Sequence, residues 1–261
     1  MKIAVIGGNR FTGKNLVEKL IDNKYKVTLF NRSATGHEKA NIFKFDRDTD
    51  KIDFKKFDCI VDMCLYTMKQ FKLIKKTIPK NTKYIFISSG AVEYEDVFGE
   101  YAKQKKLIEI ALSKTKFDYT IIRPSYIDGV GSHLKRIEYF INSIKNNTEI
   151  RIEGESGNYP VNIVWVGDVV RTIKKIIETD SKITKKKIYN VCANESVTLD
   201  EVIEQIKSKL KIDTHKMINT LGSPFNKSEF EMDNSLTKKE LKIKFNPVSY
   251  IIDILIKELD D

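Results

Sequence analysis

Short, almost uniformly apolar runs alternate with amphipathic stretches through the first half of the chain. Between several of these runs, apolar residues recur at helical spacing, as in Leu16–Ile21 and Met68–Ile74. Strands that are apolar on both faces and separated by helices are typical of a parallel sheet with helices on both sides. We therefore predict an α/β protein with a doubly wound parallel sheet. Its strands are expected at Ile3–Ile6, Val27–Phe30, Ile42–Phe45, Cys59–Met63, Tyr84–Ile87 and Tyr119–Ile122.

The regular alternation ends after Pro124, which indicates a second, smaller part of the molecule. With 261 residues, of which 41% are hydrophobic, the chain can form one large sheet domain and a lobe. No internal repeat or low-complexity linker separates the two parts, so the lobe is built from inserted and C-terminal pieces. Further helices are expected at Ile137–Ile144, Asp168–Glu178, Thr198–Leu210 and Val248–Leu259, and further strands at Ile150–Ile152, Val161–Val166 and Ile188–Val191.

A glycine-rich turn, GGNRFTG at residues 7–13, joins the first predicted strand to the first helix. Glycines permit a tight turn and the close approach of a pyrophosphate, and the helix N-terminus presents N–H groups to it. The common short-chain dehydrogenase spacing would place a glycine at position 10, where this chain has Arg10. We predict a dinucleotide-binding turn in a Rossmann-type domain. Its cofactor-binding residues are Gly7, Asn9, Arg10, Phe11 and Gly13.

The turn resembles that of the NAD(P)-dependent epimerase/dehydratase family, within the extended and atypical short-chain dehydrogenases/reductases. Further similar segments follow in the family's order: Asp46–Asp48, Arg123–Gly131, Trp165–Val169 and Tyr189–Val191. The resemblance implies that residues 1–125 and 167–195 form the dinucleotide-binding Rossmann domain. Residues 126–166 and 196–261 would form the substrate-binding lobe, with the active site in the crevice beyond the carboxyl ends of the strands. It also implies that Asp46, Arg47 and Pro124 contact the cofactor.

Candidate catalytic residues follow from a Y-x-x-x-K match, Tyr101 to Lys105. The chain contains 11 Tyr and many Lys, so such a match is expected by chance, and only its place after the strand ending at Ser88-Ser89 makes it informative. One helical turn places both side chains on one face, where Lys105 can lower the pKa of Tyr101. By resemblance, Lys105 also holds the nicotinamide ribose. We predict Ser89 as the third catalytic residue; a register shifted by one would place Gly90 there instead.

The end of the second predicted strand bears on the choice of dinucleotide. NAD-preferring sites place an acidic residue there, about 20 residues past the glycines, to bond the ribose 2′-hydroxyl. This chain has Asn31, Arg32 and Ser33, and Arg32 with Arg10 suits a 2′-phosphate. We therefore expect NADP(H) as the favoured cofactor, although Asn31 can also bond the plain ribose of NAD(H).

The predicted function is an NAD(P)-dependent oxidoreductase or epimerase that transfers hydride between nicotinamide and a carbonyl or alcohol substrate. Sugar-nucleotide epimerases usually carry an Arg for the diphosphate where this chain has Val161, which argues against a large nucleotide-sugar substrate. Arg136 or Arg151 can substitute, so a sugar-derived small molecule is retained as the substrate class. The sequence leaves open the substrate itself and whether the chain forms a homodimer.

The net charge of +10 suggests nucleic acid as an alternative partner. Only seven of the 46 basic residues are Arg, and the lysines are scattered, which is typical of a solvated surface. An RNA-binding protein on a dehydrogenase scaffold nevertheless stays an alternative, because the chloroplast stem-loop RNA-binding proteins carry a similar turn. A catalytically silent dinucleotide sensor is the other alternative.

The remaining residue classes predict neither a metal site nor a membrane segment. Cys59, Cys64 and Cys192 form no CxxC pair and are expected to be reduced thiols. The three His residues, at 37, 133 and 215, lie far apart and lack metal-ligand spacing. The first apolar run is too short for a signal peptide, and no run is long enough to span a bilayer. We expect a cytoplasmic protein without bound metal.

Overall fold

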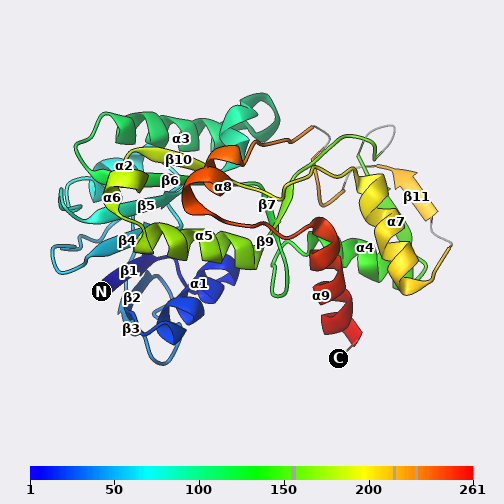
Figure 1. The fold of residues 1–261 in the computed structure, drawn as a ribbon, viewed down its shortest axis with the longest axis horizontal. Helices are drawn as coiled ribbons and strands as arrows, with labels where there is room; N and C mark the ends of the chain where they lie inside the picture. Colours follow the sequence, from blue (N-terminus) through cyan, green and yellow to red (C-terminus); the bar gives the residue numbers. More distant parts are fainter. Residues whose placement is uncertain (154–156, 214–215, 221, 227–228, 261) are drawn as a thin grey trace. The chain divides into compact units, whose positions relative to one another are not determined.

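The computed structural model describes residues 1–153, 157–213, 216–220, 222–226 and 229–260. The chain divides into two compact units (Figure 1). Unit 1 comprises Met1–Pro124, Val169–Val191 and Ser235–Ile243. Unit 2 comprises Ser125–Asp168, Cys192–Asn234 and Lys244–Asp261.

Unit 1 is built on a 7-stranded sheet in the order β10-β6-β5-β4-β1-β2-β3. Every neighbouring pair in this sheet is parallel, so the predicted doubly wound α/β fold is confirmed. The order reverses between β1 and β4, and this switch point is where such sheets bind ligands. The strands are β1 (Lys2–Ile6), β2 (Lys26–Asn31), β3 (Asn41–Lys44), β4 (Cys59–Asp62), β5 (Lys83–Ile87), β6 (Asp118–Pro124) and β10 (Lys187–Val191).

Helices cover the sheet, and apolar strand residues form the core. Figure 1 shows α1 and α3 on opposite sides of the strands. On the α2/α3 side, Phe71 and Leu112 pack in one cluster with Ile60, Tyr84 and Phe86 of the sheet. The helices are α1 (Phe11–Asp22), α2 (Met68–Ile74), the 3₁₀ turn η1 (Gly90–Glu93), α3 (Glu95–Ser113), α5 (Val166–Glu178), α6 (Ser181–Thr184) and α8 (Ser235–Leu241).

The segment Ser235–Ile243 belongs to unit 1, whereas the sequence analysis placed all of residues 196–261 in the second lobe. The reason is a set of polar contacts between α8 and strand β10. The Thr237 hydroxyl donates to the Asn190 carbonyl over 2.6 Å. The Glu240 carboxylate accepts from the Tyr189 hydroxyl at 2.6 Å and from Lys187 Nζ at 2.7 Å. Hydropathy alone gave no sign of these contacts.

The described residues of unit 2 form two small parallel strand pairs and three helices. Strand β7 (Tyr126–Asp128) pairs with β9 (Ile163–Trp165), and β8 (Glu149–Ile152) pairs with β11 (Lys216–Asn219). The predicted strand 161–166 is shorter than expected, because Val161 makes only isolated bridges and α5 begins at Val166. The helices are α4 (Arg136–Lys145), α7 (Leu199–Leu210) and α9 (Val248–Asp260), and the predicted capping box of Thr198 and Glu201 opens α7.

None of the helices in the described part of the chain combines the length and the hydropathy that crossing a bilayer requires.

Candidate functional site

The glycine turn between β1 and α1 has the geometry of a phosphate-binding cradle. Gly7 has a φ of +84°, which favours glycine, and its N–H donates to the Phe30 carbonyl over 2.9 Å. A Cβ on Gly13 would lie 2.7 Å from the Gly8 Cα and 2.8 Å from the Gly7 oxygen, so the helix can pack on the turn only without a side chain there. Arg10 caps α1 with its backbone and makes no side-chain cap. The residues present therefore fit a dinucleotide pyrophosphate at this helix N-terminus.

The polar residues after β2 form a connected loop beside the turn. Asn9 Nδ2 donates to the Ser33 hydroxyl over 2.7 Å, and Ser33 Oγ donates to Asn31 Oδ1 over 3.1 Å. Asn31 Nδ2 donates to the Thr35 carbonyl over 2.9 Å. The structure thus brings together the predicted ribose-binding residues from two separate segments. Arg10 and Arg32 are both exposed, and neither guanidinium has a hydrogen-bond or ion-pair partner among the described residues.

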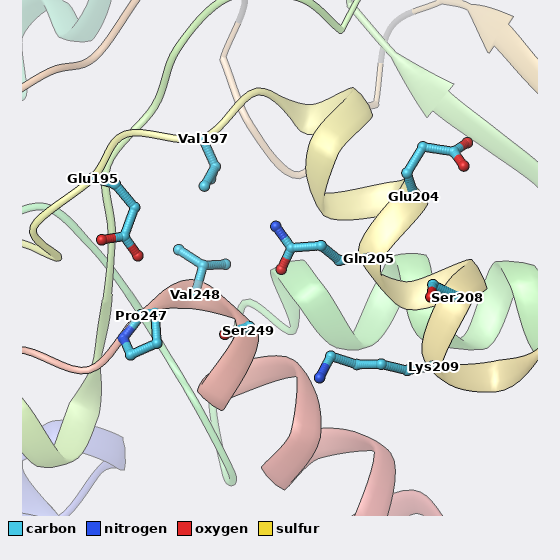
Figure 2. A pocket seen from close by; sticks show the side chains of 9 residues that line it. All are labelled: Glu195, Val197, Glu204, Gln205, Ser208, Lys209, Pro247, Val248 and Ser249. Atoms are coloured by element: carbon cyan, nitrogen blue, oxygen red, sulfur yellow. The ribbon is translucent and has the colours of Figure 1, made fainter.

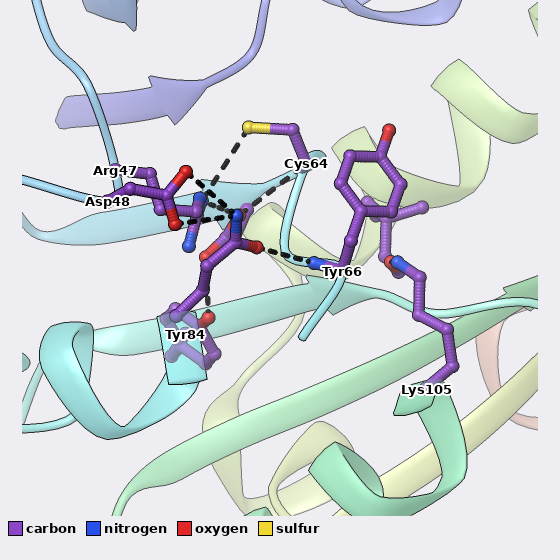
Figure 3. Close-up of polar contacts among 9 residues, drawn as sticks. Arg47, Asp48, Cys64, Tyr66, Tyr84 and Lys105 are labelled. Atoms are coloured by element: carbon purple, nitrogen blue, oxygen red, sulfur yellow. Dashed lines mark hydrogen bonds and ion pairs between the residues drawn. The ribbon is translucent and has the colours of Figure 1, made fainter. Parts of the chain in front are cut away.

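Arg47 has surroundings that the sequence analysis did not foresee. Its side chain is 7% exposed, and Nη2 forms an ion pair with Asp62, which is fully buried at the end of β4. The Tyr84 hydroxyl donates to the same carboxylate over 2.8 Å (Figure 3). Nε and Nη1 of Arg47 are buried without hydrogen-bond partners within the described residues. The contacts observed for Arg47 are therefore to protein groups beneath the carboxyl ends of the strands.

Of the other predicted cofactor residues, Asp46 is turned into its own loop, where its Oδ1 accepts from the Asp48 N–H at 3.0 Å. Pro124 is buried at the end of β6, whose neighbour Arg123 forms ion pairs with Glu109 and Glu93. Both segments lie in unit 1 with the glycine turn.

The Ser89 hydroxyl lies near enough to the Tyr101 phenol to influence its pKa. Burial raises the pKa of Tyr101, and the Ser89 hydroxyl opposes that rise. The Ser89 side chain also accepts from the Ala91 N–H at 3.2 Å and so caps the 3₁₀ turn. The sequence left open whether position 89 or 90 holds the serine role; the Ser89 hydroxyl acts on the Tyr101 pKa, and its catalytic role stays a prediction.

Gly99 interrupts α3 two residues before Tyr101. It has φ +56° and ψ −137°, a conformation that side chains rarely adopt, and no atom lies within 4 Å of a Cβ built there. Residues before and after Gly99 are helical, so the break sets the direction of the segment that carries Tyr101 and Lys105. The Y-x-x-x-K motif gave no sign of this break.

Lys105 lies below the phenol in an almost dry environment. Its side chain is 2% exposed, Nζ donates to the Ile87 carbonyl over 2.8 Å, and Nζ is 5.9 Å from the centre of the Tyr101 ring. Burial lowers the pKa of Lys105 to about 8, although Asp62 and Cys64 act in the opposite direction. Tyr101 is 42% exposed as a residue, yet desolvation of its phenol raises its pKa, so the lowering expected from Lys105 is not seen.

Two residues that the sequence did not single out, Asp62 and Tyr66, act on Lys105. Asp62 is a carboxylate at the end of an otherwise apolar strand, which is a signal that could have been noticed. Tyr66, in the loop after β4, places its ring 4.9 Å from Lys105 Nζ and 6.5 Å from the Tyr101 ring centre. A lone Tyr in a loop carries no such signal.

The two arginines predicted for the substrate lobe, Arg136 and Arg151, differ in their burial and contacts. In unit 2, Arg136 Nε donates to the Pro224 carbonyl over 3.0 Å, and its guanidinium lies 4.8 Å from the Tyr126 ring centre. Burial lowers the pKa of Arg136. Arg151 is exposed, and Val161 is fully buried and bridged to Val197. Arg136 is therefore the desolvated cation of the two.

Unit 2 also carries a pocket of about 580 Å³ bordered by α7 and α9 (Figure 2). Val197 and Val248 contribute apolar surface to it, and the Gln205 side chain reaches in between them. Gln205 Oε1 is buried and has no partner within the described residues. None of the residues predicted for catalysis or cofactor binding lines this pocket.

No three His, Cys, Asp or Glu side chains gather closely enough to hold a metal ion in the part of the chain that the structure describes. His215 lies outside the described residues.

Part of the chain matches the model of a known protein family. Residues 83–192 match the model of the NAD dependent epimerase/dehydratase family. The family resemblance is confirmed. The matched segment runs from β5 to just past β10, so it includes Ser89, Tyr101 and Lys105 of the candidate site.

Curated relatives are distant. The chain is 24% identical over 231 residues to the chloroplast stem-loop binding protein of 41 kDa b of Arabidopsis thaliana, covering 76% of this chain and 60% of that protein. It is 24% identical over 258 residues to a putative UDP-glucose 4-epimerase of Methanocaldococcus jannaschii, covering 80% of this chain and 82% of that one.

Among solved structures, the chain is similar to the UDP-glucuronic acid 4-epimerase of Bacillus cereus in complex with UDP-glucuronic acid and NAD. The TM-score is 0.80 at 15% identity, with 99% of this chain and 100% of the other covered. This likeness confirms the Rossmann-type α/β fold over nearly the whole of this chain.

Proposed function

We propose that the protein is an NAD(P)-dependent enzyme of the epimerase/dehydratase type that acts on a carbonyl or alcohol group of a small, sugar-derived molecule. The observation that carries this proposal is the position of Lys105 Nζ, 5.9 Å from the centre of the Tyr101 ring and in the same unit as the glycine turn, with the Ser89 hydroxyl acting on the same phenol. A serine, a tyrosine and a lysine so arranged can orient an oxygen and move a proton to or from it.

Tyr101 is the proposed acid–base residue. Because burial raises the pKa of its phenol, Tyr101 is protonated near neutral pH and suited to donate a proton to a carbonyl oxygen. In the reverse direction the phenolate accepts the alcohol proton, so oxidation is expected to quicken as the pH rises. Ser89 holds the reacting oxygen through its hydroxyl. A bound nicotinamide dinucleotide supplies the hydride donor or acceptor.

NADP(H) is the cofactor that we propose on the basis of Arg10 and Arg32. Both are exposed and unpaired among the described residues, and the Asn9–Ser33–Asn31 hydrogen bonds fix the loop that carries Arg32. A planar, permanently charged guanidinium is well suited to a phosphate monoester. The B. cereus epimerase was solved with NAD, so a preference for NADP(H) would distinguish this chain from that protein.

The substrate is proposed to bind in unit 2 through a negatively charged group. Arg136 supports this, since its guanidinium is desolvated, rests on Tyr126 and has no carboxylate ion pair among the described residues. Its partners are the Pro224 carbonyl, the aromatic rings and, electrostatically, Asp128, so a bound anion would add compensation for the desolvated charge.

Turnover of a panel of carbonyl compounds, including phosphorylated and acidic sugars, tests the proposal. Wild type and Tyr101→Phe should be compared with NADPH and NADH, following absorbance at the nicotinamide band. Loss of a general acid–base group lowers the rate by about 10²–10⁴-fold. Cofactor binding, followed by fluorescence, should be retained in Tyr101→Phe. Equal rates for the two proteins would remove Tyr101 from the mechanism.

A further inference from the structure

The ammonium group of Lys105 is surrounded by aromatic rings. Nζ lies 4.9 Å from the ring centres of both Tyr66 and Phe86, and 5.9 Å from that of Tyr101. One of its N–H groups donates to the Ile87 carbonyl over 2.8 Å. Since the side chain is 2% exposed, water does little to solvate the charge. The ring faces, with their negative quadrupoles, are therefore its principal close neighbours.

Of these rings, Tyr66 is the one whose place needs an explanation. Phe86 is fully buried in the sheet, and Tyr101 is the proposed acid–base residue. Tyr66 is 49% exposed and lies in a loop, so burial of its ring in the core does not account for its position. Figure 3 shows Tyr66 and Lys105 together with Arg47, Cys64 and Tyr84.

Specific hydrogen bonds hold the Tyr66 backbone. Its N–H donates to Gln70 Oε1 over 3.0 Å, and the Gln70 N–H donates to the Thr67 hydroxyl that caps α2, over 3.2 Å. Gln70 Nε2 also donates to Asp48 Oδ1 over 3.2 Å, which ties this loop to the one after β3. The loop is thus anchored on both sides, and the ring is presented to Lys105 from a fixed backbone.

We propose that Tyr66 is a positioning residue that keeps the Lys105 ammonium charged and in place beneath Tyr101 through the face of its ring. The role of Tyr66 in catalysis rests on the proposed function. The effect of its ring on the charge of Lys105 does not depend on that function. An aromatic face attracts the protonated amine and not the neutral one, so it favours the charged form.

The charge on Lys105 is finely balanced by its neighbours. Burial lowers the pKa of Lys105 to about 8; Asp62 at the end of β4, Cys64 after it and Glu109 of α3 raise the pKa, and Arg47 lowers it. A balance near physiological pH means that a modest interaction decides how much of the amine is charged. That makes the contribution of the Tyr66 ring measurable.

The decisive experiment titrates Lys105 directly, without turnover. Protein labelled with ¹³C at the lysine ε-carbon is followed by NMR against pH, and Lys105→Met identifies the Lys105 signal by its loss. Tyr66→Leu removes the aromatic face, and Tyr66→Phe retains it while removing the hydroxyl. We expect the Lys105 midpoint to fall by about half to one and a half pH units in Tyr66→Leu and to stay near the wild-type value in Tyr66→Phe.

An unchanged or higher midpoint in Tyr66→Leu overturns the proposal, and so does an equal fall in Tyr66→Phe, which would assign the effect to the hydroxyl. Gln70→Leu gives a second measurement without changing Tyr66: release of the loop should lower the midpoint by a smaller amount than Tyr66→Leu. The alkaline limb of the kcat/KM profile should move with the midpoint. If no substrate is turned over, the proposed function fails, while the NMR titration still decides the role of Tyr66.

Discussion

Arg47 and Asp62 form an ion pair in a nearly dry setting beneath the carboxyl ends of β3 and β4. Asp62 is fully buried, accepts a further hydrogen bond from the Tyr84 hydroxyl at 2.8 Å, and holds the pKa of Arg47 above its usual range, although burial alone would lower it. The pair lies in the same unit as the glycine turn. Its energetic value is testable by removing each charge.

Arg47→Met should be among the most destabilising single changes in the chain. It leaves the buried Asp62 charge without its countercharge, which costs about 3–5 kcal/mol. The double variant Arg47→Met/Asp62→Asn removes both charges and keeps an acceptor for Tyr84, so most of the loss should be recovered. Urea unfolding followed by circular dichroism measures both. If the double variant is no more stable than Arg47→Met, the pair is not the source of the loss.

Gly99→Ala should lower turnover by more than the change in global stability explains. The backbone conformation at Gly99 costs a side-chain-bearing residue about 1–3 kcal/mol, and relaxation of the break would move Tyr101. Gly222→Ala, at a glycine of φ +103° in unit 2, is the matched control. It should lose stability while the folded fraction keeps its kcat/KM. Wild-type turnover in folded Gly99→Ala would show that the break does not position Tyr101.

Lys105→Met should abolish turnover and yet stabilise the fold at neutral pH. Burial lowers the pKa of Lys105 to about 8, so between pH 8 and the higher pKa of an unfolded lysine the unfolded chain binds more protons than the native one. Wild-type stability from this group therefore rises with pH across that window. Below pH 8 the buried charge lowers the free energy of unfolding by up to about 3 kcal/mol, because each unit of pKa shift corresponds to 1.36 kcal/mol.

The measurement is the difference in unfolding free energy between wild type and Lys105→Met at pH 7 and at pH 10. It should shrink as the pH rises. Lys106→Met, at the exposed next position of α3, controls for the loss of one lysine and should show no such trend. A pH-independent difference would contradict the desolvation of Lys105.

Arg32→Ala should narrow the difference between the dissociation constants of NADPH and NADH. A charged hydrogen bond contributes about 1.5–3 kcal/mol, which corresponds to roughly 10–100-fold in affinity for the 2′-phosphate. NADH binding should change little. Arg171→Ala removes another exposed Arg, on α5, and should leave both constants unchanged. If NADH binds wild type as tightly as NADPH, the preference for NADP(H) is wrong.

The alternation of apolar runs and helical stretches determined the parallel sheet, because strands buried on both faces need uninterrupted hydrophobic sequence. The glycine turn was equally visible, since Gly13 packs against Gly8 with no room for a Cβ. Both features are local in the sequence. The order of the family-like segments also identified the region that holds Ser89, Tyr101 and Lys105.

Tertiary structure alone decided the surroundings of those residues. The apposition of Tyr66 and Lys105, the ion pair of Arg47 and Asp62, and the packing of α8 on β10 join residues that lie far apart in the sequence. No periodicity encodes them, because side-chain pairing depends on strand order and on loop paths. For the same reason the predicted lowering of the Tyr101 pKa was not found: desolvation depends on everything packed around the phenol, which a motif of five residues does not contain.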